Sequence, residues 1–393
     1  MTGNDIHIGK LQLKEDNGLY TVTALVDGAP LWFESADHPL RIAPEAIAGT
    51  LLLPAMLKGR NLVFEDPLCP VWLENARQIM DFHHDWWGWS PVEIRSSHQE
   101  QPVRHEGNKT ALCFSGGVDS FHSITTYPEP IDYIVTVHGY DIRLSDAAGG
   151  KHALDNIREV ADTYNVKHIA FRTNLRDHHL AGRRYHYSFE GALAAIGYLL
   201  ADVKAHIISS DYSRDAIQRY HIKTGSHWYT GPLRSSADIK IIHFGEAFTR
   251  DEKLRQIAHI PLLRTHLRIC QENLGSDFNL GGQYLNCGKC CKCMRTLIPL
   301  LQTTGLDEFK CFANKEHIDD CINEIETSAD YACITYEGFI AIGVSPVLER
   351  SIRALIWRSR FLNKRPWLGR KGKKILARLF MSWRDLKQRL SGE

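Results

Sequence analysis

The sequence predicts an α/β protein in which a parallel sheet is covered by helices on both faces. The main observation is that short apolar runs alternate with helical patterns after residue 110. The runs are residues 111–114, 133–137, 168–172 and 206–209, and the helical patterns are residues 121–127, 153–164 and 190–203. This alternation is typical of parallel strands joined by helical crossovers. A glycine-containing turn after the first run and a cysteine cluster near residue 290 add two candidate sites.

The chain has 393 residues, 44% hydrophobic and 24% charged, which is enough for two or three domains. The pattern divides it into an N-terminal α+β domain (1–107), an α/β domain (108–345) and a C-terminal tail (346–393). The net charge of +1 conceals a contrast, because residues 351–393 hold 13 Lys or Arg and 2 Asp or Glu. The tail therefore has an excess of +11, and the rest of the chain sums to −10.

The N-terminal domain is expected to open with a β-hairpin. Residues 5–13 and 19–26 alternate apolar and polar side chains, and Asn17-Gly18 between them is a turn signal. The polar stretch 96–109 at the end of this domain is interpreted as a linker.

Residues 71–89 predict a helix, because Trp72, Ile79, Phe82 and Trp86 recur at helical spacing. This helix contains the adjacent pair His83-His84, followed by Asp85. Neighbouring side chains on a helix point about 100° apart, so the two histidines are poorly placed to share one metal ion. An aromatic core or a substrate-stacking surface is favoured here.

The chain shows neither a secretion signal at its start nor an apolar run of about 18 residues, and a cytoplasmic protein is expected. It has ten cysteines. In a reducing compartment, clustered cysteines more often bind metal than form disulfides.

The turn Ser115-Gly116-Gly117-Val118-Asp119-Ser120 lies between an apolar run and a helical pattern. Where a strand leads into a helix N-terminus, unpaired N–H groups and the helix dipole attract an anion. The two glycines allow a phosphate to approach the backbone, and Ser115 and Ser120 add hydroxyl donors. Asp119 is compatible with phosphate if a divalent cation bridges them. The spacing matches neither a Walker loop nor a dinucleotide fingerprint.

The turn resembles the PP-loop, SGGxDS, of the N-type ATP pyrophosphatases. The resemblance implies a Rossmann-like adenine-nucleotide α-hydrolase fold, with ATP and Mg²⁺ as ligands and cleavage between the α and β phosphates. It implies that Asp119 is catalytic and that the loop binds the nucleotide through Phe114, Ser115, Gly116, Gly117, Val118, Asp119 and Ser120. A plain glycine turn is the alternative.

The second candidate site is a cluster of cysteines, in which Cys287, Cys290 and Cys293 follow one another at two-residue spacings. Such turns direct successive thiolates at one centre, and tetrahedral Zn²⁺ takes four. Cys270 is the expected fourth ligand, and Cys291 is spare. Chance burial and an iron–sulfur cluster are the alternatives.

The PP-loop and the cysteine pattern together resemble 7-cyano-7-deazaguanine synthase over residues 108–305. Besides the four cysteines, Gly288 and Arg295 match that family's pattern. The resemblance implies adenylation of a deazaguanine carboxylate, amide formation with ammonia and dehydration to a nitrile, with zinc in a structural role.

Two cations, Arg250 and Lys253, lie in the first turn of the helix that the capping box Thr249-x-x-Glu252 predicts. Cations oppose the dipole at a helix N-terminus, so a polyphosphate or acyl-adenylate would explain them. The family resemblance also places a Lys here, against nucleotide phosphates. Solvated surface charge is the alternative.

Ligands of open α/β sheets bind beyond the carboxyl ends of the strands. Asp211 follows the run 206–209 and is a candidate for contact with substrate or Mg²⁺, or else a helix N-cap. By the same rule, Val137 and His138 are expected to flank the adenine.

The tail predicts a basic amphipathic helix whose apolar face holds Leu376, Leu379, Phe380, Trp383, Leu386 and Leu390. Such a helix can bind a protein, nucleic acid or an anionic membrane, or dock on its own body.

Together with these observations, the family resemblance implies an ATP-dependent adenylating C–N ligase with structural zinc and catalytic magnesium, in which Asp119, Arg250 and Lys253 act on the phosphates. The partners are ATP, a deazaguanine-like carboxylate and an amine donor, and a homodimer is left open. One alternative is conjugation of the acid to a protein amine in a defence system. Others are a tRNA-modifying sulfurtransferase and a nucleotide-sensing scaffold.

Overall fold

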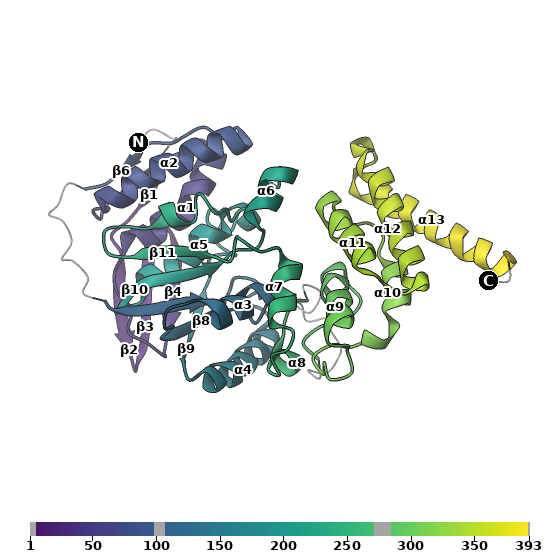
Figure 1. Cartoon of the computed structure of the whole chain (residues 1–393). Coiled ribbons are helices and arrows are strands. Elements are labelled where there is room, and N and C mark those ends of the chain that lie inside the picture. The colour runs from purple at the N-terminus through teal and green to yellow at the C-terminus, as the bar shows by residue number, and fades with distance from the viewer. Residues whose placement is uncertain (1–4, 98–106, 271–283, 392–393) are drawn as a thin grey trace. The chain divides into compact units, whose positions relative to one another are not determined.

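The computed structural model describes residues 5–97, 107–270 and 284–391. The chain forms two compact units, one running to Thr249 and the other beginning at Arg250 (Figure 1). The first unit is a mixed α/β structure with a large, mostly parallel sheet, and the second is helical.

The sheet of the first unit has the strand order β11-β10-β7-β8-β9-β4-β3-β1-β5-β6, with β2 paired to β3. The strands are β1 (Asp5–Ile8), β2 (Gln12–Asp16), β3 (Leu19–Val26), β4 (Ala29–Ser35), β5 (Asn61–Phe64), β6 (Ile94–Arg95), β7 (Lys109–Cys113), β8 (Tyr133–His138), β9 (Lys167–Thr173), β10 (Val203–Ser209) and β11 (Lys240–Phe244). From β7 to β11 all pairings are parallel, and β8 and β10 lie on opposite sides of β7. The four apolar runs of the sequence are therefore strands, as predicted.

The N-terminal strands belong to this same sheet. The predicted turn at Asn17-Gly18 is present, and both residues have positive φ (51° and 82°). The predicted first strand 5–13 is wrong in its bounds, because it is divided into β1, which pairs in parallel with β5, and β2, which forms the hairpin with β3. β4 then pairs antiparallel with β9 through Phe33 opposite Thr173. The predicted domain boundary at residue 107 consequently falls inside one sheet and one hydrophobic core, and residues 98–106 of the predicted linker lie outside the described residues.

The helices of the first unit are α1 (Pro44–Lys58), α2 (Pro70–Trp87), α3 (Val118–Thr126), α4 (Ala147–Tyr164), α5 (Tyr185–Leu199), α6 (Arg214–Tyr220) and the 3₁₀ turn η1 (Pro232–Arg234). α1 and α5 pack against each other and both contribute buried alanines and leucines to the core. The predicted helix 190–203 ends earlier, at Leu199, because Val203 already begins β10.

The helices of the second unit are α7 (Arg250–Ile257), α8 (Leu263–His266), α9 (Cys291–Thr303), η2 (Lys315–His317), α10 (Ile318–Glu324), α11 (Asp330–Ile342), α12 (Pro346–Asn363), η3 (Pro366–Leu368) and α13 (Gly369–Ser391). α12 packs against α10 and α11 and buries Leu348, Ile352, Leu355 and Leu362. The predicted tail boundary at 346 therefore marks the start of a helix that belongs to the second unit.

The amphipathic helix predicted in the tail is α13. The structure does not describe the side chains of three residues of the predicted apolar face, Trp383, Leu386 and Leu390. No helix among the described residues is long and apolar enough to cross a membrane.

Candidate functional site

The Ser-Gly-Gly turn connects the end of β7 to the first turn of α3. The Phe114 N–H donates to Val135 O of β8 (2.8 Å), which keeps the chain in the sheet up to this residue. Gly116 then has φ of +76°, a conformation that favours glycine, and Gly117 is the N-cap of α3. Having no side chain, Gly117 offers no acceptor to the first-turn N–H groups. The turn therefore has the backbone geometry of an anion-binding helix start.

The side chains of this turn divide into buried and accessible ones. Phe114 and Val118 lie in the core, where the Phe114 ring meets Phe121 edge-on at 5.1 Å. The Ser115 side chain is exposed. The Ser120 hydroxyl is buried and donates to Gly117 O (3.0 Å), so it stabilises the turn itself.

The two residues predicted to flank adenine end β8. His138 is buried, and its Nε2 donates to Arg143 O (2.8 Å), which fixes the loop after the strand. A Cβ on Gly150 of α4 would lie only 2.7 Å from the His138 ring, so this contact requires glycine. Val137 is half-buried and packs against the core beside it.

Asp211 lies two residues beyond β10, and β10 is the neighbour of β7 on the side opposite to β8. The turn of Asp119 and the Asp211 segment therefore begin at the carboxyl ends of adjacent parallel strands. Strand order reverses at this place, because β8 and β9 follow on one side and β10 and β11 on the other. Such switch points are where open α/β sheets bind ligands.

The Asp211 carboxyl is an unusual acid. Thr224 Oγ1 donates to its Oδ2 (3.1 Å), while its buried Oδ1 has no hydrogen-bond partner among the described residues. Burial, and after it the negative charge of Asp119, raises the pKa of Asp211 to about 6. Two carboxylates that repel each other in this way form a suitable oxygen ligand set for a hard divalent cation.

A buried polar network that the sequence analysis missed lies beside Asp211, centred on Glu190 of α5. Its carboxylate, fully buried, accepts from Arg234 Nε (3.1 Å) and His243 Nδ1 (3.0 Å), and also from Ser226 Oγ (3.1 Å). Burial alone would raise the pKa of Glu190, but the His243 hydrogen bond and the Arg234 charge hold it at about 2. A lone carboxylate in the apolar stretch 189–200 was the signal that could have revealed it.

The aromatic segment of α2 borders this network. His83 is buried, stacks on Trp87 (4.7 Å, 5°) and has a pKa lowered to about 3, mainly by burial and then by Arg234. Phe82 packs on His227 (4.6 Å). His84 is exposed, with Nδ1 3.0 Å from Trp89 O. The two histidines thus have separate surroundings, and the segment is an aromatic cluster, as the sequence favoured.

The four predicted cysteines of the second unit converge. The Sγ atoms of Cys270, Cys287, Cys290 and Cys293 all lie within 4.8 Å of one another, so they could hold a metal ion. The four shorter separations run from 3.3 to 3.8 Å. A tetrahedral site with Zn–S bonds of about 2.3 Å has sulfur separations of about 3.8 Å, whereas a disulfide needs about 2.05 Å. The donor set therefore fits a thiolate-bound metal.

The backbone around the cluster is fixed by two residues between the ligands. Gly288 has φ of +70°, and a Cβ there would lie 1.5 Å from Ala313 O. Asn286 is fully buried, and its Oδ1 accepts from the N–H groups of Ile269 (2.8 Å) and Cys270 (3.1 Å). Its Nδ2 donates to Leu267 O (2.7 Å) and Cys311 O (3.1 Å). One amide thus joins three segments of the site.

Cys291 is excluded from the cluster, as predicted. Its Sγ lies 3.1 Å from Ser328 Oγ and 3.6 Å from Tyr336 Oη, on the side of α9 that packs against the following helices.

Arg250 and Lys253 lie in the first turn of α7, which begins where the capping box predicted. Lys253 is only 1% exposed, so the alternative of a solvated surface charge is wrong for this residue. A buried ammonium must be compensated by anionic or polar groups. The contact of both cations with ATP phosphates stays a prediction.

Comparisons of the chain with protein-family models, with curated proteins and with solved structures found no match.

Proposed function

We propose that the protein is an ATP-dependent adenylating C–N ligase that acts on a deazaguanine-type carboxylate. The observation that carries this proposal is the placement of Asp119 and Asp211 on either side of the switch point between β7 and β10. An anion-binding turn beside two carboxylates suits a magnesium-bound triphosphate, and the strand order β9-β8-β7-β10-β11 suits the Rossmann-like fold that the PP-loop resemblance implies.

In the proposed reaction, a carboxylate oxygen of the substrate attacks the α-phosphorus of ATP, and pyrophosphate leaves. The amine then attacks the acyl carbon, AMP leaves, and an amide forms, which is the precursor of a nitrile. The Ser115–Ser120 turn would hold the pyrophosphate through its N–H groups, and the family resemblance assigns its neutralisation to Arg250 and Lys253. Asp119 and Asp211 would hold Mg²⁺, which offsets the charge of the phosphates when bound.

The metal proposed for the thiolate cluster is zinc in a structural role. Four cysteines leave no open coordination position for a substrate. Asn286 and Gly288 would then hold the ligand segments in place from outside the cluster.

The sulfurtransferase alternative needs a reactive cysteine pair outside the cluster. Burial raises the pKa of Cys113 to about 12 and that of Cys311 to about 12, so neither is a ready thiolate. This observation argues against a sulfurtransferase that uses these two cysteines, and the acceptor in the proposed ligase reaction is ammonia or a protein amine.

The test is a screen for pyrophosphate release over candidate carboxylates, with mass spectrometry of the product. A mass corresponding to an amide, a nitrile or a protein adduct identifies the acceptor. Direct formation of ADP and inorganic phosphate would contradict the proposal, and ATP binding without any turnover would favour the sensing scaffold.

A further inference from the structure

The second unit exposes an unusual set of apolar side chains near the C-terminus. Among the described residues, five large apolar side chains are more than 55% exposed, and all five lie between residues 342 and 379. They are Ile342 (57%), Trp357 (57%), Trp367 (78%), Ile375 (62%) and Leu379 (59%). Apolar surface concentrated in this way marks an interaction site.

Helix α13 packs on α12 through Phe380, whose ring lies 5.4 Å from those of Trp357 and Phe361, and two of its cations bind Glu326. Arg378 Nε donates to Glu326 Oε1 (2.8 Å), and Lys374 Nζ lies 3.8 Å from Glu326 Oε2. Ile375 and Leu379, one turn apart on the helix, are turned to solvent. A helix that docks on its own body normally buries its apolar stripe. The exposed stripe of α13 therefore lacks a partner among the described residues.

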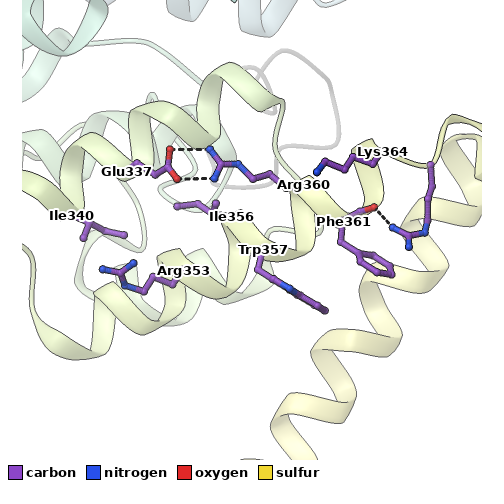
Figure 2. Close-up of a pocket in the computed structure, with 9 residues that line it drawn as sticks. Glu337, Ile340, Arg353, Ile356, Trp357, Arg360, Phe361 and Lys364 are labelled. Carbon is purple, nitrogen blue, oxygen red and sulfur yellow. Dashed lines mark hydrogen bonds and ion pairs between the residues drawn. The ribbon is translucent and has the colours of Figure 1, made fainter.

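A groove beside α12 continues this surface (Figure 2). It has a volume of about 590 Å³ and is lined by residues of α11 and α12 and by Lys364 and Arg365. Trp357 stacks on Phe361 (5.4 Å, 21°) and meets Phe380 of α13 edge-on (5.4 Å). Arg360 is neutralised by two bonds to Glu337 (2.8 and 2.9 Å), as Figure 2 shows. The groove is thus lined by two stacked aromatic rings together with four cations and one carboxylate.

Unpaired cations surround these apolar groups. Residues 350–384 contain 12 Lys or Arg and no Asp or Glu. Lys364, Lys371 and Lys373 make no ion pair with any residue that the structure describes. The surface formed by α12 and α13 is therefore both apolar and strongly positive.

We propose that the surface formed by α12 and α13 binds an anionic lipid bilayer, with α13 lying in the interface. Tryptophan and aliphatic side chains flanked by lysines suit the boundary between headgroups and acyl chains. Single-stranded nucleic acid would use the aromatic rings and the cations, but it gives Ile375 and Leu379 no partner. Each Lys or Arg near an anionic surface adds further attraction, which salt weakens.

The test uses the full chain and sedimentation with vesicles of phosphatidylcholine, either alone or with about 30% phosphatidylserine. The expected result is binding to the phosphatidylserine vesicles that weakens as salt is raised. The paired variant Ile375→Gln/Leu379→Gln should lower the partition coefficient at least about tenfold, because it removes the inserted apolar groups. Lys371→Gln/Lys373→Gln should lower it as well and reduce the salt dependence.

The matched control is Leu25→Gln/Ile42→Gln, which changes two exposed apolar residues of the first unit and should bind as the wild type does. Circular dichroism verifies that each variant is folded. Absence of wild-type binding, or equal binding by Ile375→Gln/Leu379→Gln, overturns the proposal. A wild-type dimer that this variant dissociates, without lipid binding, would assign the surface to a second copy. Binding of a single-stranded oligonucleotide in place of vesicles would assign it to nucleic acid.

Discussion

The negative charge of Asp119 adds to burial in raising the pKa of Asp211, although the two residues are 92 positions apart in the sequence. Each follows one of two adjacent parallel strands, and each begins a loop at the same edge of the sheet. This pair gives the candidate nucleotide site a charge that a bound cation would relieve.

Asp119→Ala should lower pyrophosphate release at least about 100-fold, because it removes one of the two proposed magnesium ligands. The fold should be retained, since this side chain is only half-buried. Steady-state pyrophosphate assays and circular dichroism measure the two effects. Asp215→Ala, an exposed position on α6, is the control and should stay active. An active Asp119→Ala enzyme would remove Asp119 from the mechanism.

Stability should depend on the ionisation of Asp211. Its folded pKa of about 6 lies above the ordinary value of 3.8, so the folded state favours the protonated form. The free energy of unfolding therefore falls as pH rises from about 4 to 6, and it stays at the lower value above pH 6. Asp211→Asn should raise the free energy of unfolding by about 1–2 kcal/mol near pH 8 without Mg²⁺.

Mg²⁺ should stabilise the wild type near pH 8 and should have little effect on Asp211→Asn. Thermal unfolding with and without Mg²⁺ checks both parts, with Asp215→Asn as the control. Equal stabilisation of wild type and Asp211→Asn by Mg²⁺ would show that the cation binds elsewhere.

Elemental analysis should find one zinc ion per chain. Cys290→Ser should lose the metal and lower the melting temperature, because a tetrahedral structural site needs all four thiolates. Cys291→Ser is a closely matched control and should keep the metal, since its thiol faces Ser328 instead. Loss of zinc in Cys291→Ser, or iron in the purified protein, would contradict the assignment.

Asn286→Ala should destabilise the second unit by about 3 kcal/mol or more, because it leaves the buried N–H groups of Ile269 and Cys270 and the carbonyl of Leu267 without partners. Asn314→Gly removes a single hydrogen bond to Cys287 O (2.9 Å), suits the positive φ of this position (52°) and should cost about 1 kcal/mol. Urea unfolding monitored with zinc content measures both. Similar costs for the two variants would show that Asn286 does not organise the site.

Glu190→Gln should destabilise the first unit by about 3 kcal/mol or more, because it leaves the buried Arg234 guanidinium without its anion. The wild-type contribution is present above the ordinary pKa of 4.5 and is lost as pH falls toward 2. Glu129→Gln, which is exposed, is the control. An unchanged melting temperature in Glu190→Gln would mean that the network contributes no net stability.

Local patterns predicted much of this fold, because strand and helix periodicity depends on near neighbours in sequence. The runs that became β7, β8, β9 and β10 are examples, and so is the spacing of the four cysteines that converge and could hold a metal ion. The antiparallel pairing of β4 with β9 was missed because it joins residues about 140 positions apart. The Glu190 network was missed for the same reason, since its partners come from three later segments.

The pairing of β4 with β9 also sets an order of events during synthesis. Residue 35 leaves the ribosome long before residue 173, and at about 5–20 residues per second the delay is roughly 7–30 s. During that interval the hydrogen-bonding edge of β4 has no native neighbour on that side. An unpaired edge is a template for pairing with another chain. A nascent chain therefore needs β9 soon after β4, and slow translation between them should favour aggregation.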